Sequence, residues 1–369
     1  MNRPDVKEFQ IKRNRIDNFL DSSGYDALVI GTTANFAWAT CGGDSHILLD
    51  SQAGSCLLVF TRSGTYCVAN RMDARRLEEQ ELCGLGFSVV SLKWFETPVA
   101  DYALGLVKDM RVLSDIPLPG VECNFQMFYR LHYPLTEQEI MRYRQIGKAA
   151  EEATAAVAAY ARAGLTGSDI AAALMAEFAN RQLVLSCMIL GVDDDISRYR
   201  HPLPWDKKID EALMLVLSGK RYGLNVPITR MIYFKEVPED IQKRYLAACT
   251  IEANTIKRCV PGEKFFNISM MQKSLYKEFG YEKEWEEHFV GGLTGYMAND
   301  ASFCTDRDAV LVDRQTFNWY VTITGVNVEE TMASMDGKQE LFTVTGLWPT
   351  ETFVVDNDKL ALPQIMIKE

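Results

Sequence analysis

The stretch RHPLPWDKKIDEALMLVLSGKRYGLNVPITRMIYF, residues 200–234, decides the fold of this chain. It predicts a loop that carries His201, an apolar strand Leu213–Leu217, a turn Ser218–Gly223 and a second apolar strand Val226–Phe234. From the first strand to the end of the second there is no Asp, Glu or His. The stretch therefore predicts a strand pair at the centre of a domain, without an acidic or imidazole ligand on either strand.

Helical segments surround this strand pair in the sequence. One of them, Leu135–Arg162, is rich in Ala and Glu, and Thr136 followed by Glu139 is the pattern of a capping box. The other expected helices are Thr166–Arg181, Pro238–Cys259 and Ile268–Phe279, and the later strands are Ala309–Val312, Thr316–Val321 and Glu351–Val355. We therefore expect residues 134–369 to form an α+β domain with two similar halves around an antiparallel sheet.

The N-terminal third of the chain has a different pattern. Helix Lys7–Ser23 is followed by short strands and one more helix up to about residue 125. The expected segments are the strands Ala27–Ile30, Ser55–Phe60, Tyr66–Ala69 and Phe87–Leu92, and the helix Met72–Leu82. This alternation predicts a separate α/β domain over residues 1–133, and a length of 369 residues suits two domains.

Composition excludes several classes of function. The chain is 47% hydrophobic and 24% charged, as globular proteins are, and its net charge of −11 disfavours nucleic-acid binding. It has no apolar run of the roughly 18 residues that span a bilayer, and its charged start does not resemble a signal peptide. The nine cysteines have no metal-ligand spacing. We expect buried free thiols, a cytoplasmic location, no membrane partner and no nucleic-acid partner.

Candidate catalytic residues lie in four short segments. His201 follows Arg200 in RHPLP, and His288 lies in EEHFVGGLTGY. The carboxylates are Asp300 and the pair Glu329 and Glu330, expected just after a strand. Imidazoles together with carboxylates suit general acid–base catalysis, because their surroundings can move their pKa values apart. Each residue by itself is also typical of an ordinary surface loop.

Taken together, these segments resemble the creatinase/aminopeptidase P/methionine aminopeptidase family. HPLP and VPITR resemble its His-containing loop and its Asp-x-Thr-Arg strand, and LTEQEIMRYRQIGKAAEEA resembles the helix that opens its catalytic domain. HFVGGLTGY and TFNWYVTITGVNVEETM resemble its His-Gly motif and closing Glu strand, and GYDALVIGTTANFAWATCGG resembles its N-terminal domain. The implied fold class is α+β, a C-terminal pita-bread domain after a creatinase-like α/β domain.

The sequence departs from this family at the metal ligands. The family's metallopeptidases hold two divalent metals with two Asp, one His and two Glu. If Thr229-Arg230 anchors the comparison, the second Asp position is Pro227 and the first is about Val216, or Ser218 with a shorter turn. His288 or Phe289 takes the His position, Asp300 is near the first Glu position, and Glu329 takes the last. Val and Pro side chains cannot ligate a hard cation, so we expect neither a metal nor another cofactor.

The resemblance therefore implies a metal-independent hydrolase or lyase like creatinase, acting on a small amide, amidine or amino-acid derivative. His201 is the expected general base or acid, with His288 a second proton carrier. Glu329, Glu330 and Asp300 would hold a cationic or polar group or orient a histidine, and Arg200 or Arg230 would bind a carboxylate. The alternatives are a non-catalytic binding protein and an Xaa-Pro aminopeptidase or dipeptidase with an altered metal site.

The resemblance also implies partners. The expected ligand is a small molecule or a short peptide. Family members are commonly homodimers in which the N-terminal domain of one subunit leans on the cavity of the other. Residues 35–46 would then complete the site, with Trp38 and His46 as candidates.

Overall fold

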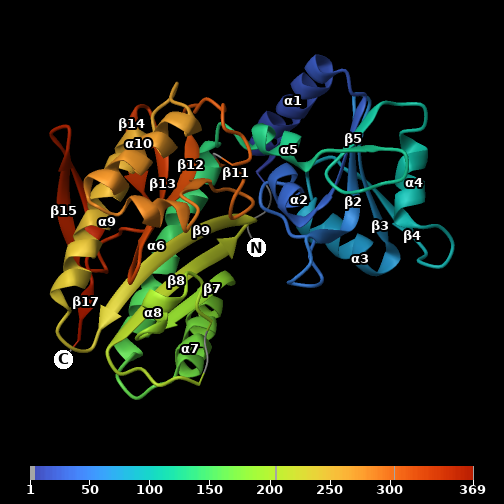
Figure 1. Cartoon of the computed structure of the whole chain (residues 1–369). Coiled ribbons are helices and arrows are strands. Elements are labelled where there is room, and N and C mark those ends of the chain that lie inside the picture. Colours follow the sequence, from blue (N-terminus) through green and yellow to red (C-terminus); the bar gives the residue numbers. More distant parts are fainter. Residues whose placement is uncertain (1–4, 204–205, 303, 369) are drawn as a thin grey trace. The chain divides into compact units, whose positions relative to one another are not determined.

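The computed structural model describes residues 5–203, 206–302 and 304–368. The chain folds as two compact units, Met1–Tyr133 with Tyr222–Leu224, and Pro134–Arg221 with Asn225–Glu369 (Figure 1). None of the described helices is both long enough and apolar enough to cross a membrane.

The first unit is built on a six-stranded mixed sheet of order β4-β3-β2-β1-β5-β6. Alternate residues point to opposite faces, so Val29, Val59 and Val68 form a core with Ala103 and Val107 from the region of helix α4. The strands are β1 Ala27–Thr32, β2 Ala53–Thr61, β3 Thr65–Asn70, β4 Ser88–Leu92, β5 Val112–Ser114 and β6 Glu122–Cys123. The helices are α1 Val6–Ser23, α2 Thr33–Ala39, α3 Arg71–Arg76, α4 Val99–Leu106 and α5 Phe125–His132, with a π-helical turn Leu77–Glu81.

In the second unit the strands form two sheets and a hairpin rather than the single sheet expected. One sheet has the order β11-β10-β12-β13-β14, the other β17-β9-β8-β7, and β15 pairs with β16. The strands are β7 Val184–Val192, β8 Ala212–Arg221, β9 Leu224–Tyr233, β10 Gly291–Leu293, β11 Ala301–Ser302, β12 Gln315–Ile323, β13 Val326–Met335, β14 Lys338–Leu341, β15 Thr350–Val355, β16 Asp358–Pro363 and β17 Met366–Ile367.

Helices cover these sheets: α9 packs on β12 and β13, α7 on β7 and α6 on β8 (Figure 1). The helical bounds are α6 Glu137–Tyr160, α7 Gly167–Asn180, α8 Asp195–Arg198, α9 Glu239–Arg258 and α10 Phe265–Glu278, with a 3₁₀ turn Glu282–Glu286. The capping box is confirmed, because Thr136 Oγ1 accepts from the Glu139 N–H at 3.2 Å while Glu139 accepts from the Thr136 N–H at 2.7 Å. The first helix of this unit therefore begins where the sequence predicts.

Three sequence predictions about these strands are wrong. The turn between β8 and β9 is the pair Tyr222-Gly223, not Ser218–Gly223, and both residues have positive φ, as a two-residue hairpin turn requires. Ala309–Val312 is not a strand and makes only an isolated bridge through Val310. Glu329 and Glu330 lie inside strand β13 rather than after a strand, so their side chains point to opposite faces of the sheet.

Candidate active site

A cavity of about 240 Å³ lies in the second unit, between its two larger sheets. A cavity of this size suits a small ligand. Most of the wall is apolar. The charged or polar side chains on the wall are Arg200, His201, Ser218, His288, Asn299, Asn318, Thr322, Asn327 and Glu329, with Cys187, Tyr199 and Tyr320 beside them. The wall therefore joins the loop before β8, the strand pair β8–β9 and the facing strands β12 and β13.

The structure brings His201 and His288 into direct contact at this wall. His288 Nδ1 lies 2.9 Å from the Phe289 carbonyl oxygen, which can only accept, so Nδ1 carries the proton. His288 Nε2 then accepts from His201 Nε2–H at 3.0 Å. Burial lowers the pKa of His288 despite the bond to the Phe289 carbonyl, and the charges of His201 and Arg200 lower it further. His288 is therefore neutral at pH 7, and Nε2 of His201 carries a proton.

Glu329 is the carboxylate of the cavity wall. It lies on β13 directly opposite Tyr320 on β12, and both side chains line the cavity. Its Oε2 accepts from Thr229 Oγ1 at 2.6 Å, and Thr229 in turn accepts from Asn327 Nδ2 at 3.1 Å. Burial raises the pKa of Glu329 to about 7, although hydrogen bonds from Thr229 and Asn318 act in the opposite direction. Such a group changes charge easily near neutral pH, as functional carboxyls often do.

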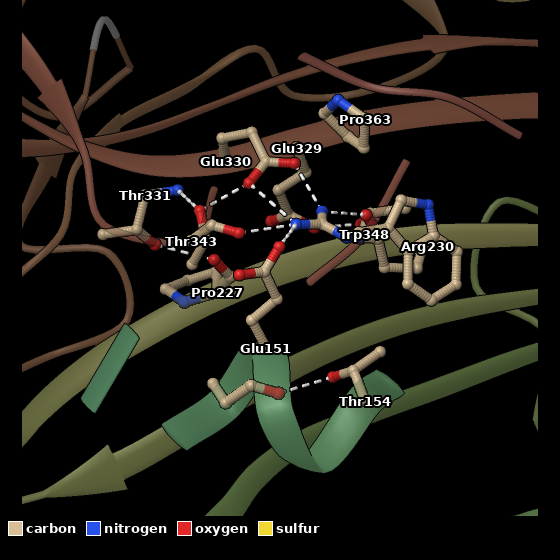
Figure 2. Close-up of polar contacts among 12 residues, drawn as sticks. Glu151, Thr154, Pro227, Arg230, Glu329, Glu330, Thr331, Thr343, Trp348 and Pro363 are labelled. Atoms are coloured by element: carbon tan, nitrogen blue, oxygen red, sulfur yellow. Dashed lines mark hydrogen bonds and ion pairs between the residues drawn. The ribbon is translucent and has the colours of Figure 1, made fainter. Parts of the chain in front are cut away.

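Arg230 and Glu330 do not line the cavity, contrary to the expectation that they bind substrate. Figure 2 shows the two side chains paired inside the protein, where Arg230 Nη2 also donates to the Thr343 carbonyl at 2.6 Å. Glu151 Oε1 lies 3.7 Å from the same guanidinium, which lies over the Trp348 ring, 5.6 Å from its centroid. Burial raises the pKa of Glu330 to about 7, against the effect of Arg230. This buried cluster ties β9 to β13 and to α6.

The other expected carboxylate also lies elsewhere. Asp300 is buried outside the cavity wall and accepts from the Met297 N–H at 3.1 Å, so it does not face Glu329. The strand partner of Glu329 is Tyr320, which the sequence analysis missed. The alternation of Asn318, Tyr320 and Thr322 along one strand face was the signal available for it.

Arg200 lines the cavity as expected, but it is already paired with Glu284 from the 3₁₀ turn. Glu284 also accepts from the N–H and the hydroxyl of Thr324, at 3.2 and 3.0 Å. Burial by itself would raise the pKa of Glu284, but these bonds and Arg200 outweigh it and lower the pKa. Sequence reasoning missed Glu284, because a Glu in a short charged segment is usually a solvated surface residue.

The two candidates from the first unit differ from each other. Trp38 is completely buried in the core of that unit, with its ring 5.6 Å from the ring of His132. It therefore cannot reach a partner's cavity, and that expectation is wrong. His46 is partly exposed and bonded to Asp44.

The cavity wall does not fit a dinuclear metal centre. Val216, Ser218 and Pro227 all line the cavity; the resemblance puts the second family Asp at Pro227 and the first at about Val216 or at Ser218, and none of these side chains supplies a carboxylate. Among the described residues, no group of three or more His, Cys, Asp or Glu lies close enough to hold a metal ion.

Comparisons with known proteins agree with this architecture. The model of metallopeptidase family M24 matches residues 141–335, more than half of the chain. The fold is similar to Xaa-Pro dipeptidase from Bacillus anthracis, with a TM-score of 0.78 and 14% identity over 98% of this chain and 100% of that one. It is similar to dipeptidase PepE from Mycobacterium ulcerans, with a TM-score of 0.78 and 14% identity over 99% of each chain.

A third structure of similar fold has a different printed description. It is the N-terminal domain of FACT complex subunit SPT16 from Cicer arietinum, with a TM-score of 0.69 and 11% identity over 93% of this chain and 97% of that one. Comparison with curated protein sequences finds no significant match. The α+β fold class and the family resemblance are thus confirmed, and the chain belongs to metallopeptidase family M24.

Proposed function

We propose that this M24 cavity hydrolyses a small amide, amidine or amino-acid derivative without a metal. The observation that carries the proposal is the contact between His201 and His288 at the wall of a small, mostly apolar cavity. His288 is partly buried and His201 is exposed at the cavity, and acid–base groups that converge on a cavity are typical of catalytic sites. Glu329, with its raised pKa, adds the carboxyl that such a site needs.

The tautomers define a role for each histidine. In its neutral form His201 donates through Nε2–H, and its Nδ1 then carries a lone pair that can accept a proton from a water molecule. That water attacks the carbonyl or amidine carbon, and the imidazolium that forms keeps its Nε2–H bond to neutral His288. The proton then passes to the leaving nitrogen as the carbon–nitrogen bond breaks. Glu329 holds the polar or cationic end of the substrate.

A binding protein is the second candidate, and one observation favours it. Phe289, next to His288, is 66% exposed at the cavity, where an apolar ring suits contact with a partner. The similarity to the SPT16 domain supports this candidate at the level of fold only. An altered Xaa-Pro peptidase is disfavoured by Val216 and Pro227, which provide no ligands.

The test is hydrolysis by chelator-treated protein whose metal content is measured by elemental mass spectrometry. We expect turnover of at least one small amide or amidine at less than about 0.1 metal equivalents per chain, since His201 and not a metal activates the water. Turnover that appears only after Mn, Co or Zn is added would contradict the proposal and favour the altered peptidase. No turnover across amides, amidines and Xaa-Pro dipeptides would favour the binding protein.

We also propose that the chain forms a homodimer through its first unit. Ile47, Leu48 and Leu49 follow His46 and are all exposed, and three adjacent apolar side chains are typical of an interface. Light scattering coupled to gel filtration should give twice the chain mass of 41.7 kDa, and Leu48→Asp should shift it toward that of the monomer. A monomeric mass for the unaltered protein would contradict the dimer.

A cytoplasmic location remains part of the proposal. All nine cysteines are free thiols, as is usual for proteins of a reducing compartment.

A further inference from the structure

We infer that Glu284 sets the charge selectivity of the cavity: by holding Arg200 in an ion pair, it makes the site accept ligands with a cationic nitrogen and reject ligands with a free carboxylate. The inference rests on the proposed function in so far as it treats this cavity as the ligand site. It goes further because it names the substrate class and a residue that determines it.

The ion pair is built into the fold. Arg200 lies in the loop before β8, and Glu284 lies in the 3₁₀ turn that follows α10. Thr324, at the turn between β12 and β13, donates both its N–H and its hydroxyl to Glu284 Oε2. Both charged side chains are about three-quarters buried, at 25% and 21% exposure. A ligand carboxylate would have to compete with a partner that is already held by two hydrogen bonds.

The other charged groups of the cavity wall also favour a cationic ligand over a carboxylate. Among the described residues that line the cavity, Arg200 is the one side chain with a permanent positive charge, and Glu284 neutralises it. Glu329 is the one lining carboxyl, and both lining histidines take part in a mutual hydrogen bond. A cationic nitrogen entering the cavity therefore finds an acidic partner. A carboxylate finds an arginine that is already paired, and it meets a like charge at Glu329 whenever that carboxyl is ionised, in a site where desolvation makes both effects costly.

This selectivity separates the chain from a dipeptidase. A dipeptide carries a free carboxylate at its C-terminus as well as an ammonium group, whereas an amine or amidine without that carboxylate meets no repulsion here. Ser218 also lines the cavity, and its buried hydroxyl has no hydrogen-bond partner among the described residues. The ligand class that fits is a small amine, amidine or guanidine whose acid group is absent or blocked.

Agmatine and arginine are suitable probes, because they differ only in the carboxylate. Calorimetry on the intact protein should show agmatine binding at least about ten-fold more tightly than arginine, a difference of about 1.4 kcal/mol. Glu284→Gln keeps an oxygen for Thr324 but removes the charge, so it should tighten arginine binding at least ten-fold and leave agmatine unchanged or weaker. In Arg200→Gln/Glu284→Gln, the gain for arginine should disappear.

Several outcomes would overturn the inference. They are equal affinity of the unaltered protein for both probes, arginine binding unchanged in Glu284→Gln, and no binding of either probe at about 1 mM. If Glu284→Gln does not fold, Arg200→Gln replaces it, and it should weaken arginine binding and strengthen agmatine binding, because Glu284 is then unpaired. These experiments measure binding and not hydrolysis. If the protein bound the probes as expected but hydrolysed no substrate, the proposed reaction would be wrong and the inferred charge selectivity would still stand.

Discussion

Replacing Arg230 by Met should lower the free energy of unfolding by about 3–5 kcal/mol, the usual cost of breaking a buried ion pair from one side. The guanidinium is almost completely buried between Glu330 and Glu151, and it donates to the carbonyl of Thr343 (Figure 2). It also donates to the carbonyl of Thr229. Without it, Glu330 is a buried carboxyl with no cation. Urea unfolding, followed by a signal from the second unit, measures the loss.

The loss should depend on pH. Burial already raises the pKa of Glu330 above its unfolded value, and removal of Arg230 takes away the main opposing effect. A carboxyl with a raised folded pKa contributes stability at low pH and loses it as pH rises through that pKa. Arg230→Met should therefore be less destabilised at pH 5 than at pH 8. A pH-independent loss would contradict this account of Glu330.

The chain offers a matched control for Arg230. Arg144 on α6 makes a bidentate pair with Glu340 on β14, at 2.7 and 2.8 Å, but both side chains are well exposed. Arg144→Met should change the free energy of unfolding by less than about 1 kcal/mol, because solvent screens the pair. If Arg230→Met does not fold, Glu330→Gln can replace it. It breaks the same buried ion pair and should lower the free energy of unfolding by a smaller amount. Equal losses for Arg230→Met and Arg144→Met would mean that burial of the pair has no consequence.

Once a substrate is identified, His201→Ala should lower kcat/KM by about 10²–10⁴, the usual contribution of a general base. The base is expected to be Nδ1 of His201, and the variant retains the cavity wall but not that atom. His288→Ala should have a smaller effect, because His288 positions His201 and stabilises its charged form through one hydrogen bond at 3.0 Å. Steady-state kinetics on protein of measured metal content tests both expectations.

A conservative variant of His288 tests whether this residue positions His201 through their hydrogen bond or only fills space in the fold. His288→Gln has an amide oxygen that can accept from His201 Nε2–H, so it should recover part of the activity that His288→Ala loses. Arg144 pairs with Glu340 and does not line the cavity, so Arg144→Met should leave kcat/KM unchanged. If His201→Ala retained full activity, the proposed role of His201 would be wrong.

The sequence predicted the local features of this fold well. The start of α6 follows from Thr136 and Glu139, which lie three residues apart and bond to each other's backbone N–H groups, so the sequence encodes these contacts locally. The turn at Tyr222-Gly223 was missed because a bulky residue with positive φ has no clear sequence signal. The residue pattern alone missed the strand that contains Glu329, although the family resemblance implied it, because acidic residues are uncommon in strands; here burial against α9 outweighs that preference.

By itself, the sequence determined that the strand pair β8–β9 carries Val216 and Pro227 and so has no carboxylate for a metal, because side-chain chemistry at a position needs no tertiary information. Only the tertiary structure decided which distant groups meet. His201 meets His288 across 87 residues, Arg200 meets Glu284 across 84, and Arg230 meets Glu330 across 100. These pairings depend on strand register and on how two sheets pack, which local periodicity does not encode.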